Sequence, residues 1–118
     1  KEKKIILIIL GDGNEKESIK NLVKKYKLQK RIFVLGHKKK TKKYYQESNL
    51  YINASHFEGF PNAIVEAINF SLPVVCSDTN SGVREITLNG NGLKSVIIKV
   101  WLKKFFHFIK TQNLFIKN

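Results

Sequence analysis

The chain has 118 residues, enough for a single domain with one core but small for a complete enzyme of most classes. Its 22 lysine and arginine residues against 9 aspartate and glutamate residues give a net charge of +13, which favours anionic partners such as nucleotide phosphates, nucleic acid or acidic lipid. The single cysteine, Cys76, excludes a disulfide framework and a zinc-ligand spacing and fits a reducing, cytoplasmic setting.

Short apolar runs alternate with amphipathic segments over most of the chain. The run from Ile5 to Leu10 is aliphatic throughout and ends in Gly11-Asp12-Gly13, which is typical of a parallel strand covered on both faces. Apolar residues at three- and four-residue spacing predict helices between the runs. Strands are predicted over 5–10, 31–36, 50–55 and 72–77, and helices over 15–26, 42–47 and from 61 onward.

This alternation predicts an α/β fold with right-handed crossovers, a Rossmann-like doubly wound parallel sheet of about four strands. In such a sheet, ligands bind at the carboxyl ends of the strands, where loops and helix N-termini meet. The residues predicted at that edge are Gly11, Asp12, Gly13, Gly36, His37, the loop from Ser55 to Pro61, and the turn from Ser77 to Gly82.

The segment "HFEGFPNAIVEAI", residues 56–68, carries two carboxylates eight positions apart, Glu58 before a helix and Glu66 inside it. Pro61 suits a helix start, and Asn62 and Glu66 share a face opposite the apolar residues. Carboxylates accept hydrogen bonds from vicinal hydroxyls, as in a sugar or a ribose. Spacing alone is also explained by two solvent-exposed glutamates.

The C-terminal residues differ from the rest. An apolar stripe at helical spacing predicts a basic amphipathic helix within residues 93–118, after a Rossmann-like domain over residues 1–92. This helix either closes over the sheet, docks on another domain, or lies on an anionic membrane surface. Its apolar positions are Ile97, Ile98, Trp101, Leu102, Phe105, Phe108 and Ile109.

Four stretches carry a family resemblance in their order and spacing: "LIILGDGNEKESIKNLVKKY", "IFVLGH", "SNLYINASHFEGFPNAIVEAINFSLPVVCSD" and "SGVREI". Together they resemble the C-terminal, donor-binding domain of family 4 (group 1) retaining glycosyltransferases, which have the GT-B fold. The resemblance covers residues 4–88. It implies transfer of a sugar from a nucleotide-sugar donor to a glycan or lipid-linked acceptor, as in bacterial polysaccharide biosynthesis.

The resemblance also implies roles for single residues. Glu58 would contact the transferred sugar and act as the catalytic residue, and Glu66 would bind the ribose. The loop Gly59, Phe60, Pro61 and Asn62 would bring backbone N–H groups to the sugar and diphosphate, and the segment from Leu35 to Lys38 would lie near the base. Gly82, Arg84 and Glu85 match a motif near the same site, although Arg84 and Glu85 would equally form a surface ion pair.

No metal or other cofactor is expected, because the resemblance implies that N–H groups, a helix dipole and basic side chains stabilise the leaving diphosphate. "SDT", residues 77–79, is not an Asp-x-Asp metal motif, and His37, His56 and His107 lack paired-ligand spacing. The family's phosphate-binding arginine and lysine and its N-terminal acceptor domain have no counterpart here. The sequence therefore predicts a fragment that does not catalyse transfer alone.

A different class of function stays open, a non-catalytic basic module. The segment "HKKKTKKYYQ", residues 37–46, offers lysines for phosphate contacts and tyrosines for stacking on bases, although a solvated crossover explains it better and nucleic acid is not the expected partner. The lysine excess is equally explained by coding bias. The expected location is the cytoplasm, with peripheral attachment at the inner face of the plasma membrane left open.

Overall fold

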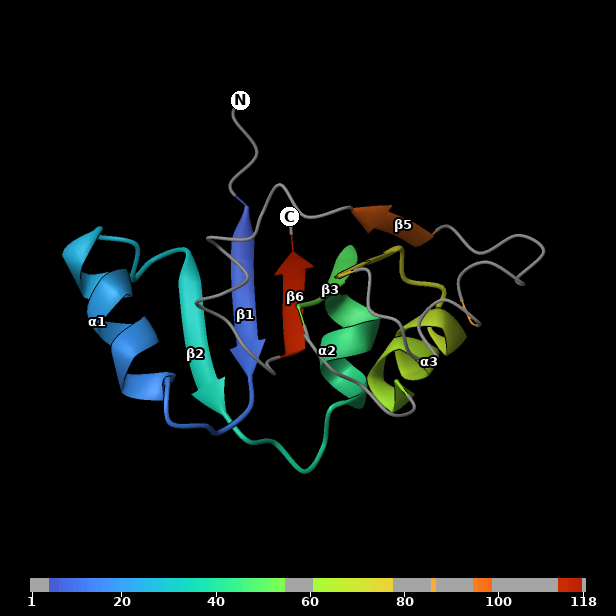
Figure 1. The fold of residues 1–118 in the computed structure, drawn as a ribbon, viewed down its shortest axis with the longest axis horizontal. Helices are drawn as coiled ribbons and strands as arrows, with labels where there is room; N and C mark the ends of the chain where they lie inside the picture. Colours follow the sequence, from blue (N-terminus) through green and yellow to red (C-terminus); the bar gives the residue numbers. More distant parts are fainter. Residues whose placement is uncertain (1–4, 55–60, 78–85, 87–94, 99–112, 118) are drawn as a thin grey trace.

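The computed structural model is an α/β fold in which helices lie on both faces of one sheet (Figure 1). It describes residues 5–54, 61–77, 86, 95–98 and 113–117. The elements in chain order are β1 Ile6–Leu10, α1 Lys16–Lys25, β2 Ile32–Gly36, α2 Lys42–Glu47, β3 Leu50–Asn53, α3 Asn62–Asn69, β4 Val74–Ser77, β5 Ser95–Ile98 and β6 Asn113–Lys117. The strands and helices predicted up to residue 77 are confirmed.

The sheet has six strands in the order β2-β1-β6-β3-β4-β5. β1 pairs in parallel with β2, and β3, β4 and β5 also pair in parallel. β6 is antiparallel to both of its neighbours, β1 and β3. The predicted Rossmann-like fold class is therefore confirmed, but the sheet has two strands more than expected and one of them is reversed.

Both additional strands come from the segment in which a C-terminal helix was expected. β5 contains Ile97 and Ile98, which were assigned to the apolar stripe of that helix. The run Ser95–Ile98 is short and rich in β-branched residues, and helical periodicity alone cannot distinguish such a run from a strand. Residues 99–112, which hold the rest of the stripe, lie outside the described residues. The division of the chain at residue 92 remains a prediction.

An aromatic core fills the face of the sheet that α2 and α3 cover. Tyr45 of α2, Tyr51 of β3 and Phe115 of β6 are at most 2% exposed. The Tyr45 ring stacks on Phe70 with centroids 5.5 Å apart and meets Phe115 edge-on at 4.9 Å. Aromatic pairs in these geometries are favourable beyond the area they bury. Each of α2, α3, β3 and β6 contributes to this cluster, which links the centre of the sheet to both helices.

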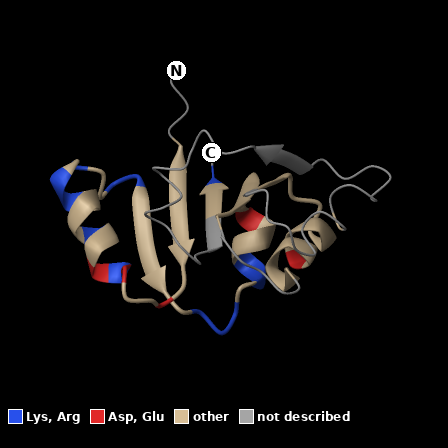
Figure 2. Ribbon diagram, in the orientation of Figure 1, with Lys and Arg blue, Asp and Glu red and all other residues tan. Residues whose placement is uncertain are grey.

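A smaller aliphatic core lies on the opposite face, under α1. Ile19 and Val23, four residues apart on α1, are buried against Ile9 of β1 and Ala54 at the end of β3. The outer surface of α1 is rich in lysine, and Figure 2 shows basic residues there and on the connection from β2 to α2. Among the described helices, only α1 contributes residues to this core.

Candidate functional site

The loops after β1 and β2 are joined directly at the carboxyl ends of the strands. The Gly11 backbone N–H donates to the Gly36 carbonyl, with 3.0 Å between nitrogen and oxygen. The Asp12 carboxylate accepts a hydrogen bond from the His37 backbone N–H at 2.9 Å. Gly11, Asp12, Gly36 and His37, all predicted as site residues, therefore lie together, and Gly13 follows in the same loop.

Asp12 is the polar centre of this edge. Its second oxygen accepts a hydrogen bond from the Lys16 ammonium at 2.6 Å. The Lys16 ammonium, followed by the His37 backbone N–H, holds the pKa of the Asp12 carboxyl below its usual value. The carboxylate thus stays ionised at neutral pH and fixes the start of α1 and the loop after β2 relative to each other.

The close approach at this edge requires a glycine at position 36. Gly36 has a φ of +71°, which L side chains rarely adopt. A Cβ at this position would lie 2.6 Å from the Lys16 ammonium and 3.0 Å from the Asp12 carboxylate. Gly36 thus allows the loop after β2 to pack against the loop after β1, which brings the predicted base-binding segment to the sheet edge.

α3 has one buried and one exposed face, as predicted for the helix that carries Glu66. Pro61 comes immediately before the helix, and its carbonyl accepts hydrogen bonds from the Ile64 and Val65 N–H groups at 3.0 and 3.2 Å. Ile64 and Ala67 are fully buried, whereas Asn62 and Glu66 are exposed. The prediction that this helix buries one face and presents Glu66 on another is confirmed.

Tyr45 links the aromatic core to α3. The Tyr45 hydroxyl lies 3.4 Å from the Ala63 carbonyl, to which it donates a hydrogen bond. Burial raises the pKa of the Tyr45 phenol, and the neighbouring Tyr51 and Glu66 raise it further. Tyr45 was not among the predicted site residues; only its position in an amphipathic helix could have indicated that it points into the core.

The remaining predicted site residues cannot be located relative to α3. Glu58, Gly59 and Phe60 lie outside the described residues, as do Gly82, Arg84 and Glu85. Their roles remain predictions, and so does a carboxylate pair formed by Glu58 and Glu66.

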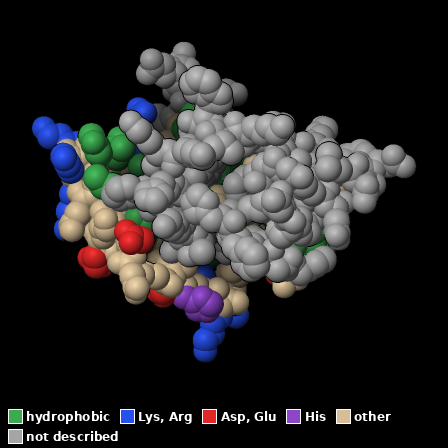
Figure 3. Space-filling view, in the orientation of Figure 1, with side chains coloured by type: hydrophobic (Ala, Val, Ile, Leu, Met, Phe, Trp, Pro, Cys, Tyr) green, Lys and Arg blue, Asp and Glu red, His purple; other side chains and the backbone are tan. Residues whose placement is uncertain are grey.

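The basic segment 37–46 does not present its tyrosines for stacking. Tyr45 is 2% exposed, and Tyr44 packs at 6.0 Å from the Phe115 ring. The lysines at 38–40 are exposed, and Figure 3 shows basic side chains projecting at the lower edge of the molecule, below the carboxyl ends of β1 and β2. The segment is thus a solvated crossover that contributes positive charge beside the candidate site.

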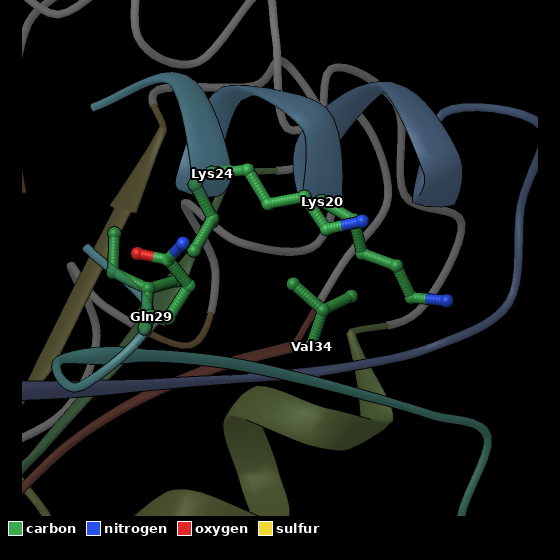
Figure 4. A pocket seen from close by; sticks show the side chains of 6 residues that line it. Lys20, Lys24, Gln29 and Val34 are labelled. Carbon is green, nitrogen blue, oxygen red and sulfur yellow. The ribbon is translucent and has the colours of Figure 1, made fainter. Parts of the chain in front are cut away.

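One cavity in the described part of the chain lies away from this edge. It has a volume of about 150 Å³ and opens between α1 and β2 (Figure 4). Its lining combines apolar side chains with lysine stems: Lys20, Val23, Lys24, Gln29, Ile32 and Val34. Gln29 precedes β2 and Ile32 is its first residue, so the cavity lies at the end of β2 opposite the candidate site.

The sequence matches the family of glycosyl transferases group 1 over residues 1–100. The chain belongs to this family. Its edge of joined loops and its α3 carboxylate are thus parts of a group 1 glycosyltransferase domain. The finer assignment to family 4 remains a prediction.

Several characterised and uncharacterised transferases are similar to the chain. It is 41% identical over 80 residues to an uncharacterized glycosyltransferase of Methanocaldococcus jannaschii, a match that covers 68% of this chain and 20% of that protein. It is 38% identical over 80 residues to the N-acetylgalactosamine-N,N'-diacetylbacillosaminyl-diphospho-undecaprenol 4-alpha-N-acetylgalactosaminyltransferase of Campylobacter jejuni, covering 68% of this chain and 22% of the relative. A poly(glycerol-phosphate) alpha-glucosyltransferase of Bacillus subtilis is 36% identical over 84 residues, covering 71% and 12% respectively. The chain therefore spans about a fifth or less of these relatives.

Within the part of the chain that the structure describes, no group of three potential metal-ligating side chains occurs. None of the helices described here is both long and apolar enough to cross a bilayer.

Proposed function

We propose that this chain is the donor-binding part of a retaining glycosyltransferase and holds a nucleotide-activated sugar at the carboxyl ends of its parallel strands. The observation that carries the proposal is the arrangement of α3. Its buried face, with Ile64 and Ala67 fully enclosed, fixes the helix against the sheet, while Glu66 on another face remains accessible. Family membership supports the same conclusion independently, because group 1 proteins are glycosyl transferases.

In this proposal Glu66 accepts hydrogen bonds from the two ribose hydroxyls, since an ionised carboxylate has two acceptor oxygens and no donor. The N-terminus of α3 would face the diphosphate, which the positive end of a helix dipole stabilises, and backbone N–H groups of Gly59, Phe60 and Asn62 would bind the same group. Glu58 contacts the transferred sugar.

The loop after β2 takes the base. Asp12 fixes this loop through the His37 N–H, and Gly36 allows its close approach to the loop after β1. The exposed lysines at 38–40 raise the local concentration of anionic donor through their field, and no direct phosphate contact is assigned to them.

The reaction breaks the bond between the anomeric carbon and a diphosphate oxygen and forms a bond from that carbon to an acceptor hydroxyl oxygen, whose proton passes to the departing diphosphate, with the anomeric configuration kept. The N–H groups and the helix dipole stabilise the charge that develops on the diphosphate. We further propose that the 118 residues bind the donor but do not complete the transfer, because they span about a fifth of the transferases that they resemble.

The test measures nucleotide-sugar binding to the whole chain by calorimetry, with UDP-N-acetylglucosamine, UDP-glucose and GDP-mannose as probes. Glu66→Gln should weaken binding about tenfold or more, because a hydrogen bond to a charged group is worth about 1.5–3 kcal/mol. Glu47→Gln is the matched control: it removes one exposed carboxylate at the far end of α2, where Glu47 pairs with Lys117 at 3.1 Å.

Equal affinities for the wild type and Glu66→Gln would contradict the ribose role, and failure of the wild type to bind any probe would contradict the donor-binding function. Efficient sugar transfer by the chain alone would refute the proposed inactivity.

A further inference from the structure

β2 is the outermost described strand of the sheet on the α1 side (Figure 1). Among the described strands it pairs only with β1. The residues of a strand turn their backbone groups alternately to its two sides. The Leu7 N–H donates to the Arg31 carbonyl at 2.8 Å, so the odd-numbered residues of β2 face β1. The backbone groups of Ile32 and Val34 therefore face away from β1, on what we call the open side of β2.

The open side of β2 keeps backbone groups that another strand can use. The Ile32 N–H is already bound within the chain, since it donates to the Leu28 carbonyl at 2.9 Å. The Ile32 carbonyl and both backbone groups of Val34 have no partner within the described residues. β2 also has no proline and no charged side chain, which are features that protect an open strand from pairing. This side of β2 can therefore accept an incoming strand.

Apolar side chains border the open side of β2 on both faces of the sheet. On the α1 face, Ile32 and Val34 line the cavity between α1 and β2, and Figure 4 shows Val34 pointing toward the helix. On the opposite face, Phe33 and Leu35 are 40% and 36% exposed. Side chains of an added strand alternate between the two faces. A residue opposite Val34 would therefore meet the cavity, and its neighbours in sequence would meet the exposed apolar pair.

Two lysines of α1 line the same cavity. The Lys20 ammonium bonds the Glu17 carboxylate at 2.6 Å, whereas Lys24 is exposed and has no ion pair within the described residues. Lys16 lies beside Gly36, so Lys24, about two helical turns further along α1, lies toward the Ile32 end of β2. Positive charge at this place favours carboxylates in an incoming segment.

Charge also decides against a second copy of this chain as the occupant. Pairing of β2 with the β2 of another copy about a two-fold axis would place the two α1 helices on the same face, side by side. Figure 2 shows basic residues along α1, and the whole chain has a net charge of +13. Such a contact would bring lysines of α1 together, which like-charge repulsion disfavours. An acidic partner meets the same surface with attraction.

We propose that the open side of β2 binds an extended acidic segment of another protein by strand addition. Antiparallel pairing lets one residue of the segment exchange both backbone hydrogen bonds with Val34, and the residue two positions further donates to the Ile32 carbonyl. Main-chain hydrogen bonds supply affinity in this mode, and alternate side chains supply specificity. The proposal depends on the open strand, the cavity and the charge of α1, and not on the proposed donor site.

The side chains of the segment follow from this register. The residue opposite Val34 is apolar and lies at the cavity. The residues on either side of it are apolar and lie beside Phe33 and Leu35. The residues two positions away on either side lie on the α1 face, and they carry the carboxylates that meet Lys20 and Lys24.

The test uses the whole chain and the blocked synthetic peptide SEIVIES, whose central valine, flanking isoleucines and glutamates match this register. Binding is measured by the change of amide chemical shifts in a titration that extends to millimolar peptide. The control peptide SKIVIKS reverses the charges. A second control carries N-methylvaline at the centre, which removes only the N–H that would donate to the Val34 carbonyl.

We expect SEIVIES to bind, with the largest shift changes in β2 and slower hydrogen exchange of the Val34 N–H. Both control peptides should bind about tenfold more weakly or less. Lys24→Glu should also weaken binding of SEIVIES about tenfold, because it replaces an attraction with a repulsion. Lys25→Glu is the matched control, since it makes the same charge change on a lysine that does not line the cavity, and should change the affinity by no more than about twofold.

Val34→Pro tests the backbone pairing from the side of the chain. Proline is tolerated in an outer strand where the N–H faces solvent, so pairing with β1 should persist while the open side loses its donor. Affinity for SEIVIES should fall about fivefold or more, because a main-chain hydrogen bond is lost. If Val34→Pro does not fold, the N-methylated peptide tests the same ladder from the side of the partner.

Absence of SEIVIES binding at millimolar concentration would overturn the proposal. Equal binding of the three peptides would do the same, and so would shift changes that leave β2 unaffected. Sedimentation that shows a dimer of the chain dissociated by Val34→Pro would assign the open side to a second copy and contradict an acidic partner. Nucleotide sugars are absent from these measurements, so their outcome is distinguishable from a failure of the donor site.

Discussion

The two parallel blocks on either side of β6 are stabilised in different ways. The block of β3, β4, α2 and α3 has an aromatic core in which Tyr51, Ile64 and Phe115 are fully buried. The block of β1, β2 and α1 has a small aliphatic core and leaves Phe33 and Leu35 of β2 exposed by 40% and 36%. Its polar edge, centred on Asp12, lies at the surface. One block therefore has the larger, aromatic core, and the other combines a smaller aliphatic core with an exposed edge of loop contacts.

This comparison predicts which single substitutions lower the free energy of unfolding most. Phe115→Ala should lower the free energy of unfolding by about 3–5 kcal/mol, because it empties a fully enclosed aromatic site. Val23→Ala, the corresponding truncation under α1, should cost about 1.5 kcal/mol, since it removes two methyl groups from a site that is still 9% exposed. Urea denaturation monitored by circular dichroism measures both values.

Equal costs at the two positions would show that the blocks are not differently stabilised. If Phe115→Ala does not fold, Phe115→Leu provides a milder truncation, whose cost should still exceed that of Val23→Ala.

The second prediction concerns the loop geometry of the α1 block. Gly36→Ala should cost about 1–2 kcal/mol, because alanine is disfavoured at a positive φ and its Cβ would displace the Lys16 ammonium from Asp12. Gly13→Ala is the matched control in the adjacent loop, where the backbone φ is not positive. If both substitutions are neutral, the conformation of Gly36 does not hold this edge together.

The sequence predicted the elements up to residue 77 because their patterns were local. Runs such as Ile6–Leu10 and Ile32–Gly36 are apolar and closed by glycine, and Ile19 and Val23 have helical spacing. The two-sided character of α3 was predictable for the same reason. Local patterns also predicted that the loops after β1 and β2 would meet at one edge.

The position of β6 could not be predicted in this way. Asn113–Lys117 forms a strand at the centre of the sheet because it pairs with β1 and β3, which are about 100 and 60 residues away in the sequence, respectively. No local pattern records such a pairing, and an amphipathic stripe just before it favoured a helix. Tyr45 was missed for a related reason: five lysines precede it in its segment, whereas its burial depends on Phe70 and Phe115, which are distant in sequence.

The smallest expected effect lies where the aromatic core meets the candidate site. Tyr45→Phe keeps the stacked ring but removes the hydroxyl that donates to the Ala63 carbonyl, so it should cost about 0.5–1.5 kcal/mol near neutral pH. The pKa of Tyr45 is raised in the folded state, mainly by burial, above the ordinary value of 10.0. The contribution of the Tyr45 phenol to the free energy of unfolding is therefore complete below pH 10. It decreases as the pH rises above 10, because the phenol then loses its proton more readily in the unfolded chain than in the folded protein.

The substituted protein lacks this group, so its stability should decline less steeply than that of the wild type between pH 10 and pH 11, and the two denaturation midpoints should converge. Tyr26→Phe is the control, because it removes the hydroxyl of a tyrosine that is 63% exposed and lies outside the aromatic core. If the free energy of unfolding falls with pH at the same rate in the wild type and in Tyr45→Phe, the Tyr45 hydroxyl is accessible to water. The aromatic core would then not extend to Glu66. A shallower slope together with weaker nucleotide-sugar binding would show that the buried block orients the carboxylate of the candidate site.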